Sequence, residues 1–255
     1  MILEMKKVRK AFGGLVAVND VDMVIEEGTI HSIIGPNGAG KTTFFNCITA
    51  LNPADSGKII FEGQEIQRLP THKICRLGIA RTFQNIRLFP YLSVLQNVLV
   101  GTHNQTTSRI LPSVLRTPAF KKEEREMVDF GMELLEKIGL ADKRDSYARN
   151  LAYGAQRKLE IARAMASRPK ALLLDEPAAG MNTSETAALD EFIRTLKDDG
   201  YTIILIEHDM KLVMSIADVI SVIDHGVKIA EGTAEVVQND EKVIEAYLGK
   251  RRDSA

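Results

Sequence analysis

The eight residues GPNGAGKT, at positions 35–42, constrain the fold of this chain more than any other stretch. They fit the pattern G-x-x-x-x-G-K-[ST] in full, directly after the apolar run TIHSII and before the helical pattern TTFFNCITAL. The glycines allow the backbone to curl so that its N–H groups point at phosphate oxygens, and the helix start adds the positive end of its dipole. This order of strand, loop and helix predicts an α/β fold with a phosphate site, whereas a chance glycine-rich turn would predict neither.

The residues of this loop are the first candidates for a nucleotide site. Lys41 is a mobile cation placed for the β- and γ-phosphates, and Thr42 offers a hydroxyl ligand to Mg²⁺. The candidate ATP-binding residues are Gly35, Pro36, Asn37, Gly38, Ala39, Gly40, Lys41, Thr42 and Thr43.

The stretch ALLLDEP, at 171–177, supplies the acidic partner that such a loop needs. Asp175 ends an apolar strand, which would hold its carboxylate at the edge of a sheet near a metal ion. Glu176 follows it, where a glutamate can orient and deprotonate an attacking water. The alternative is an acidic cap at a helix N-terminus, which is a common role for an isolated Asp-Glu pair.

Two further residues are candidates because of where they lie. Phe12, in KAFGGLVAV, is an aromatic side chain near the first strand that can stack on adenine, or it is an ordinary core phenylalanine. His208 ends the apolar run TIILIEH, where a histidine beside a nucleotide can donate a hydrogen bond to the γ-phosphate. A purely structural histidine is the alternative.

Apolar runs and helical patterns extend the α/β interpretation along the chain. Strands are predicted at MVIEEG (23–28), TIHSIIG (29–35), ALLLDEP (171–177), TIILIEH (202–208) and VISVID (219–224), with a hairpin at 57–66 that turns at Glu62–Gly63. Nearly all-apolar strands suit a parallel sheet that is covered on both faces. Helices are predicted at 36–51, 93–101, 121–140, 155–166, 184–200 and 210–217, and a polar loop with a short helix at 103–120. A helical insert therefore interrupts the sheet.

Composition excludes several classes of protein. The net charge of −1 over 255 residues is unlike the basic balance that nucleic-acid binders usually carry. Two cysteines argue against a disulfide framework, and we expect Cys47 and Cys75 to be small, buried or partly buried thiols. The N-terminus lacks a secretory signal, and no stretch approaches about 18 uninterrupted apolar residues. We expect a soluble chain whose membrane role, if any, comes through a partner.

A second anion-binding helix start is unusual in a domain that already has one. NLAYGAQRKLEIARAMA, at 150–166, places a small, flexible segment before a helical pattern that is rich in arginine and lysine. With GPNGAGKT, RTFQN, LLLDEP and EHD, this stretch resembles the ATP-binding cassette (ABC) proteins, in order and over nearly the whole chain. The glycine loop alone is shared by many nucleotide hydrolases, so the stretch before IARAMA is the specific signal.

That resemblance implies the fold and its division. It implies an α/β P-loop NTPase cassette with a RecA-like mixed or parallel sheet core, an N-terminal antiparallel β part and an inserted helical subdomain. One cassette would occupy 1–255, with a core at 1–83 and 162–240, a helical subdomain at 84–161 and a short C-terminal tail at 241–255.

The resemblance also implies a dimer in which two cassettes meet head to tail. The signature residues of one chain, Ala152, Tyr153, Gly154, Ala155 and Gln156, would then act on the ATP of the partner, and Ala179, Gly180 and Asn182 would line the interface. The usual signature is leucine-serine-glycine-glycine-glutamine, so Ala152 lacks a hydroxyl that can touch the γ-phosphate. Asn182 stands where aspartate is usual. Gln84 would touch Mg²⁺ or the water, beside the catalytic Glu176 and His208.

A closer resemblance is to the ATP-binding subunits of branched-chain amino acid importers, the larger of the two, over roughly residues 4–249. It implies ATP and Mg²⁺ as cofactors, a second cassette, transmembrane permeases and an external substrate-binding protein as partners, and a peripheral place on the cytoplasmic face of the membrane. Ile86, Leu88, Phe89 and Pro90 would help form a permease groove, or they simply pack the insert onto the core. Other cargoes, a soluble cassette protein that remodels nucleic acid or ribosomes, and a small-molecule kinase are the alternatives.

Overall fold

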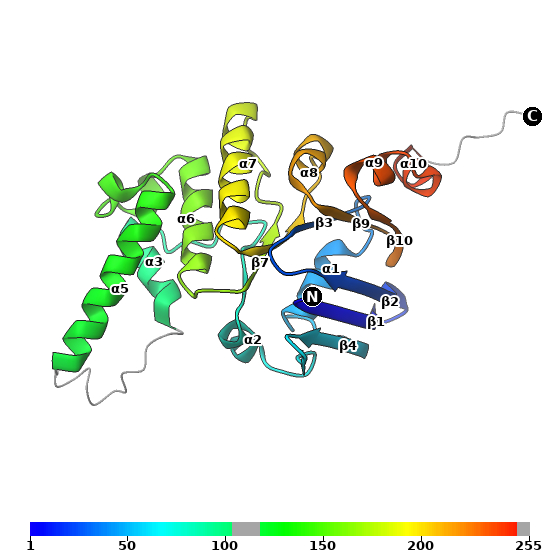
Figure 1. Cartoon of the computed structure of the whole chain (residues 1–255), viewed down its shortest axis with the longest axis horizontal. Coiled ribbons are helices and arrows are strands. Elements are labelled where there is room, and N and C mark those ends of the chain that lie inside the picture. The colour runs from blue at the N-terminus through cyan, green and yellow to red at the C-terminus, as the bar shows by residue number, and fades with distance from the viewer. Residues whose placement is uncertain (104–117, 249–255) are drawn as a thin grey trace, which may run out of the picture.

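The computed structural model describes residues 1–103 and 118–248, which form two sheets with helices around them (Figure 1). The larger sheet has six strands in the order β10 (Val227–Gly232), β9 (Val219–Asp224), β3 (Ile30–Ile34), β8 (Thr202–Ile206), β7 (Ala171–Asp175), β6 (Ile79–Arg81). All neighbouring pairs are parallel except β9 and β10. The parallel core predicted from the apolar runs is confirmed, and β3, β7 and β8 are buried along their whole length.

The smaller sheet is antiparallel, with the order β2 (Leu15–Ile25), β1 (Leu3–Phe12), β4 (Ser56–Phe61), β5 (Gln64–Glu65). The predicted hairpin is confirmed, because Phe61 pairs with Gln64 across the turn. Both turn residues, Glu62 and Gly63, have positive φ angles of 48° and 79°, as a two-residue hairpin turn with the native twist requires.

The helices divide into two groups by position. An insert at one end of the molecule contains α3 (Val94–Thr102), α5 (Pro118–Lys137) and α6 (Tyr153–Met165), with the short 3-10 turns η2 (Ala141–Lys143) and η3 (Ala148–Asn150) (Figure 1). The others are α1 (Lys41–Ile48), α2 (Thr71–Leu77), α7 (Thr183–Asp198), α8 (Met210–Ile216), α9 (Ala234–Gln238) and α10 (Glu241–Leu248). Residues 104–117 of the predicted loop lie outside the described residues.

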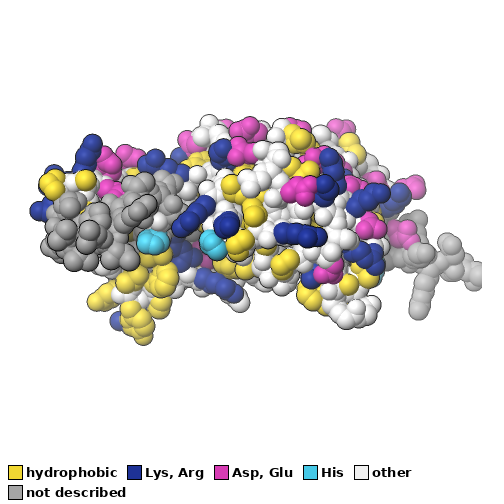
Figure 2. All heavy atoms as spheres, turned by 90° about the horizontal axis from the view of Figure 1, so that it is seen from below, with side chains coloured by type: hydrophobic (Ala, Val, Ile, Leu, Met, Phe, Trp, Pro, Cys, Tyr) yellow, Lys and Arg dark blue, Asp and Glu magenta, His cyan; other side chains and the backbone are white. Residues whose placement is uncertain are grey.

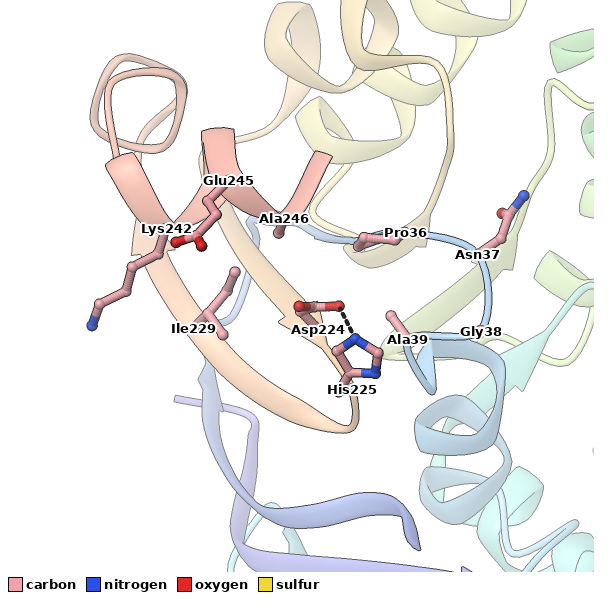
Figure 3. Close-up of a pocket in the computed structure, with 10 residues that line it drawn as sticks. All are labelled: Pro36, Asn37, Gly38, Ala39, Asp224, His225, Ile229, Lys242, Glu245 and Ala246. Atoms are coloured by element: carbon pink, nitrogen blue, oxygen red, sulfur yellow. Dashed lines mark ion pairs between the residues drawn. The ribbon is translucent and has the colours of Figure 1, made fainter. Parts of the chain in front are cut away.

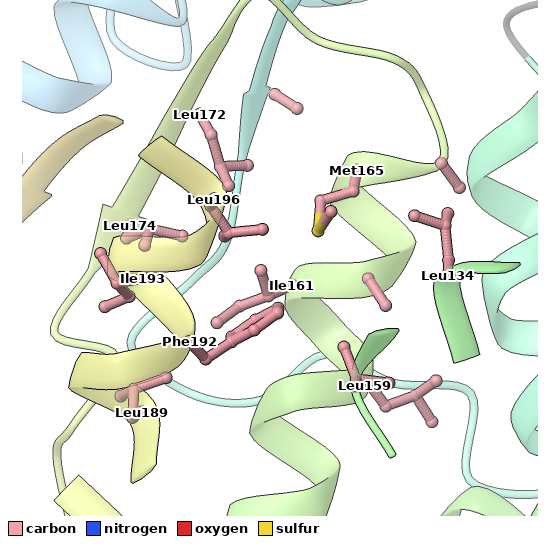
Figure 4. Close-up of a cluster of buried hydrophobic side chains, with 14 of the residues drawn as sticks. Leu134, Leu159, Ile161, Met165, Leu172, Leu174, Leu189, Phe192, Ile193 and Leu196 are labelled. Carbon is pink, nitrogen blue, oxygen red and sulfur yellow. The ribbon is translucent and has the colours of Figure 1, made fainter. Parts of the chain in front are cut away.

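Alternate residues of the central strands face two separate cores. In β7, Leu172 and Leu174 pack with α6 and α7, whereas Leu173 packs on the side of α1 and the antiparallel sheet. Figure 4 shows the first of these cores, in which Ile161 of α6 lies close to Phe192 of α7. Because one hydrophobic cluster includes both the insert and the sheet, the two parts share a packed interface rather than standing apart.

Two of the boundaries expected between core, helical subdomain and tail can be compared with the helices of the structure. The limit between residues 161 and 162 falls inside α6, so this helix belongs to the insert by its start and to the core by its end. The tail expected at 241–255 contains α10 as far as Leu248. Cys47 is buried and Cys75 is partly buried, as expected.

His31 is a buried histidine on β3. His31 Nε2 lies 2.8 Å from Ser221 Oγ, which itself donates to Glu231 Oε2 at 2.7 Å. The hydroxyl proton is thereby used, so the neutral ring donates from Nε2. Burial lowers the pKa of His31 from 6.5 to about 4; Glu231 partly opposes this shift, and Lys228 adds to it.

We expect this histidine to destabilise the fold as the pH falls. The histidine binds a proton with a pKa near 6.5 in the unfolded chain and only near 4 in the folded chain. The contribution of neutral His31 to stability is therefore fully present above a pH of about 6.5 and is lost as the pH falls below it. Between pH values of about 7 and 5 the loss is about 2 kcal/mol. Denaturant unfolding of His31→Gln, whose amide still donates to Ser221, should lack this part of the slope. An unchanged slope would contradict the assignment.

Candidate functional site

The glycine loop joins β3 to α1 and needs glycine at two positions for steric reasons. Gly35 has φ 152°, and a Cβ there would lie 1.9 Å from the Ile223 carbonyl oxygen. Gly40 has φ 100°, and its Cβ would lie 2.1 Å from the Ala17 carbonyl oxygen. The loop therefore packs against neighbouring backbone without side chains between them. Since no side chain caps α1 in the described part of the chain, its first N–H groups are available to a phosphate.

Lys41 is the buried cation of this loop. Its ammonium donates to the carbonyl oxygens of Gly35 and Pro36, at 2.7 Å and 2.8 Å. Burial lowers the pKa of Lys41, and the Glu176 and Asp175 carboxylates oppose this shift. The ammonium therefore interacts electrostatically with Asp175 and Glu176, the acidic pair that the sequence predicts as its partner.

Glu176 brings together three of the predicted catalytic side chains. Gln84 Nε2 donates to its Oε2 at 2.7 Å, and His208 Nε2 lies 2.5 Å from its Oε1. Glu176 itself has a φ of 47°, a conformation that costs a non-glycine residue energy and is found where surrounding structure enforces it. His208 therefore contacts the Glu176 carboxylate directly.

The residues expected to hold a metal suit Mg²⁺ by their chemistry. Thr42 is exposed at the start of α1, and Asp175 ends β7 with a carboxylate. Magnesium prefers hard oxygen ligands, and usually takes one or two carboxylates together with substrate phosphates. Within the described ranges, no three His, Cys, Asp or Glu side chains gather as a metal cluster.

Glu207 is a member of this site that sequence reasoning missed. Its buried carboxylate accepts hydrogen bonds from the backbone of Ala178, at 2.7 Å, and His208, at 3.0 Å. Burial raises the pKa of Glu207; backbone N–H groups lower it again, and the charge of Glu176 raises it. This carboxylate ties the segment after β8 to the segment after β7. An acidic residue that ends an apolar strand beside a candidate histidine was the available signal.

Two buried arginines were also missed. Arg81 at the end of β6 forms an ion pair with Asp175, with Nη2 and Oδ2 2.6 Å apart. Arg157 on α6 is fully buried, pairs with Glu160 at 2.9 Å, and donates to the carbonyl oxygens of Phe83 and Gln84. It therefore attaches the signature helix to the segment that carries Gln84. The arginine within RTFQN and the Arg-Glu pair at i, i+3 were visible in the sequence.

The signature residues surround the start of α6. Ala152 is the N-cap residue, and it makes no side-chain cap, so the first amides of the helix lack that partner. Tyr153 donates from its hydroxyl to the Ala179 carbonyl oxygen at 2.9 Å. A Cβ on Gly154 would lie 3.1 Å from Glu185 Oε1. The signature is thereby tied within one chain to the residues predicted for the dimer interface.

The remaining signature and interface residues have local roles. Gln156 donates to the Leu151 carbonyl oxygen. Asn182 caps α7. Its side-chain Oδ1 accepts from the backbone N–H of Glu185, and its own backbone N–H donates to Glu185 Oε2, both at 3.0 Å. The residue that replaces the usual aspartate is therefore a helix cap in this chain. Ala155 packs against the larger core.

Phe12 is 46% exposed at the end of β1, which excludes the alternative of an ordinary core phenylalanine. An exposed ring is free to stack, and Lys10 Nζ lies 5.4 Å from its centroid. Stacking on adenine stays a prediction.

A pocket of about 530 Å³ lies between the glycine loop and the end of the chain. Figure 3 shows its walls: Pro36 and Asn37 come from the loop, Asp224 from the end of β9 and His225 from the turn that follows, and Lys242, Glu245 and Ala246 from α10. Helix α10 therefore lies beside the candidate phosphate site.

A second pocket, of about 440 Å³, is bordered by both the core and the insert. We call it the groove. Ile74, Arg81 and Phe83 line it from the core side, and Phe89 and Arg163 from the insert side. Phe89 is 47% exposed, whereas Leu88 is partly buried and packs on the larger core. One residue of this segment therefore packs the insert onto the core and another lines an open groove, while the binding of a permease there stays a prediction.

The surface carries charges of both signs. Figure 2 shows basic and acidic side chains along the same face of the molecule. Among residues 1–103 and 118–248, no helix combines the length and the apolarity that crossing a bilayer requires.

Comparisons with known proteins agree over almost the whole chain. Residues 18–179 match the family described as ABC transporter, and residues 227–253 match that described as Branched-chain amino acid ATP-binding cassette transporter. The chain is 48% identical to the high-affinity branched-chain amino acid transport ATP-binding protein BraF of Pseudomonas aeruginosa and 46% identical to LivG of Escherichia coli K12, covering 98% of each chain. It is 34% identical to the lipopolysaccharide export system ATP-binding protein LptB of E. coli, with 97% of both chains covered.

Solved structures agree with the fold. The ADP conformation of MJ1267, an ATP-binding cassette of an ABC transporter, aligns with a TM-score of 0.85 at 34% identity, over 98% of this chain and 99% of that one. A nucleotide-free cassette from an ABC transporter aligns with a TM-score of 0.84 at 33% identity, over the same shares. From its sequence, its two sheets and the side chains gathered around its glycine loop, this chain belongs to the ABC transporter family as an ATP-binding cassette.

Proposed function

We propose that the chain is the ATP-hydrolysing subunit of an importer for branched-chain amino acids. The observation that carries the enzymatic part is the arrangement of Gln84 and His208 on the Glu176 carboxylate, beside the glycine loop and Lys41. The cargo is proposed by analogy with the relatives that are 46–48% identical over 98% of the chain.

The proposed chemistry divides among a few side chains. Glu176 accepts a proton from the attacking water, and Gln84 and His208 hold its two carboxylate oxygens in place. The amides of the glycine loop and the Lys41 ammonium stabilise charge on the phosphates. Thr42 and Asp175 would hold Mg²⁺, which supplies electrostatic stabilisation of the phosphoryl oxygens when bound. Gln84 is the remaining candidate ligand.

We propose that hydrolysis requires a second cassette. The exposed start of α6, without a side-chain cap, supports the role of residues 152–156 as an anion site for the nucleotide of the partner. Since Tyr153 contacts Ala179 in the same chain, the signature and the interface residues 179–182 would approach the partner as one unit. The division into a core, a helical subdomain at 84–161 and a C-terminal segment from 241 belongs to the same proposal.

The groove supports contact with a membrane permease. It is open and partly apolar, and Arg81 and Arg163 contribute basic groups to it. We propose that a short helix of a permease enters it, which would hold the chain on the cytoplasmic face of the membrane. The substrate-binding protein would act through the permease.

The dependence of ATP turnover on protein concentration tests this function. The chain alone, and then the chain with its second cassette and permeases in lipid, would be assayed over a wide dilution series. Specific turnover that rises with concentration, or that appears only with the partners, is the expected result, because the site is shared. Constant specific turnover at every dilution would contradict the shared site.

Lys41→Ala should lose nucleotide affinity. The ammonium is the cation of the loop, and a hydrogen bond from a charged donor to phosphate is among the stronger ones, so the Kd for ATP should rise at least about tenfold. Equilibrium titration with ATP checks this. Lys58→Ala, which removes an exposed lysine of β4, is the control and should bind normally. An unchanged Kd in the Lys41 variant would overturn the role of the loop.

A further inference from the structure

Arg81 is buried beside the acidic residue proposed to hold the metal. It ends β6, which runs parallel to β7, and its side chain is 6% exposed against 4% for Asp175. The guanidinium contacts Oδ2 of Asp175 at 2.6 Å, through a single terminal nitrogen. The other carboxylate oxygen therefore remains for a different partner.

The same guanidinium is fixed by the helix that follows the glycine loop. Its Nη1 donates to Asn46 Oδ1 on α1 at 2.7 Å and to Oγ1 of Thr49, the C-cap residue of α1, at 3.3 Å. The rings of Phe45 and Phe83 lie 5.5 Å and 5.4 Å from it. Its Nε has no hydrogen-bond partner among the described residues. The plane of the guanidinium is therefore set by several contacts at once.

Stability is a weak explanation for this ion pair. Taking two charges out of water costs several kcal/mol for each ion, and apolar replacements of buried pairs are often neutral or stabilising. The location of Arg81 between the groove and Asp175 offers a better explanation. Arg81 and Phe83 also line the groove, and Phe83 precedes Gln84 in the chain. One side chain thus reaches from the groove to the carboxylate of Asp175.

We propose that Arg81 is a positioning residue, which orients the Asp175 carboxylate for Mg²⁺. Through this contact, occupation of the groove by a partner changes the affinity of the metal site. The inference rests on the proposed function, since it assumes that Asp175 holds the metal of a nucleotide complex. A partner helix that enters the groove displaces Arg81 or Phe83, and the guanidinium moves the carboxylate with it. Mutation of a residue that holds a metal ligand in place typically lowers metal affinity by about 10–100-fold.

The first test measures metal affinity without catalysis. Mn²⁺ is titrated into the ADP complex of the full chain and followed by electron paramagnetic resonance. Arg81→Gln should weaken Mn²⁺ binding at least about tenfold, and Arg81→Lys, which keeps the charge, by less. The ADP affinity measured in EDTA should stay within about twofold, because the loop does not use Arg81. Arg76→Gln removes an exposed arginine of α2 and is the matched control.

A double-mutant cycle separates positioning from a general effect on the fold. Asp175→Asn should itself weaken Mn²⁺ binding, and Arg81→Gln should then add less than about a twofold change, because its target is gone. If ADP affinity in EDTA falls in step with Mn²⁺ affinity, Arg81 only maintains the fold and the proposal is wrong. Normal Mn²⁺ binding in Arg81→Gln also overturns it. Normal Mn²⁺ binding in Asp175→Asn would instead contradict the proposed metal site.

The second test occupies the groove. Cys75 lines it, whereas Cys47 is fully buried and burial raises its pKa to about 11, so N-ethylmaleimide should modify Cys75 selectively. Modification should shift Mn²⁺ affinity at least about threefold in the original chain and leave Arg81→Gln nearly unchanged. Equal shifts in both would overturn the link through Arg81, as would no shift in either.

Discussion

Replacing Glu176 with glutamine should reduce ATP turnover by about 10²–10⁴-fold while ATP binding persists. The amide keeps the size of the side chain and can still accept from Gln84, which donates to Oε2 at 2.7 Å. It cannot take a proton from water. ATP would then accumulate between the two cassettes, so the variant should elute as a dimer with MgATP and as a monomer with MgADP.

Steady-state phosphate release and equilibrium ATP titration separate the two effects. Glu191→Gln changes an exposed carboxylate on α7 and is the control for loss of a charge. Turnover above about a tenth of the original rate would show that Glu176 is not the base. Loss of ATP binding together with turnover would instead point to damage of the loop, because Lys41 lies in the field of Glu176.

The largest stability effect should follow from removing Arg157. This guanidinium is fully buried, and Arg157→Met takes from the Glu160 carboxylate, only 1% exposed, its ion-pair partner at 2.9 Å, so that only the longer contact to Arg163 at 3.8 Å remains. The carbonyl oxygens of Phe83 and Gln84 lose their donors as well. Breaking a buried pair in this way should lower the free energy of unfolding by about 3–5 kcal/mol. Denaturant unfolding measures it.

A double variant tests whether the charge left behind is the cause. Arg157→Met with Glu160→Gln removes the charge that is left with only the longer contact to Arg163, while the new amide oxygen still accepts from the Arg87 N–H that Glu160 binds at 3.0 Å. It should recover about half of the loss. Arg149→Met, at an exposed position in the insert, should stay within about 0.5 kcal/mol. A double variant less stable than the single one would contradict this account.

Sequence reasoning succeeded where the signal is local. A glycine loop between an apolar strand and a helix prescribes its own geometry, and Gly35 and Gly40 do have positive φ and no room for a side chain. Nearly all-apolar strands predicted a covered parallel sheet, because burial on both faces removes the usual alternation. Asp175 ends such a strand, and Glu176 and His208 follow such strands, so their meeting at one edge of the sheet was foreseeable.

Sequence reasoning was less complete where the signal lies between distant segments. Strands β1 and β6 and the antiparallel edge strand β10 were not predicted from the residue pattern, since β1 carries several charges and β6 has only three residues. The helix predicted at 36–51 begins only at Lys41, because the glycine loop occupies its first positions. Asn182 is predicted to line an interface, which stays a prediction, and its side chain also caps α7 within the chain, a role that the sequence reasoning did not give it.

The sequence by itself determined the fold class, the phosphate loop and the family, because each depends on the spacing of residue types along short stretches. Only the tertiary structure decided which buried charges meet. Arg81 lies 94 residues from Asp175, and Arg157 lies 73 residues from the Gln84 carbonyl that it binds. No local pattern encodes such pairs. They form because the parallel order of β6, β7 and β8 and the packing of α6 bring these segments together, and burial then requires every charge to find a partner.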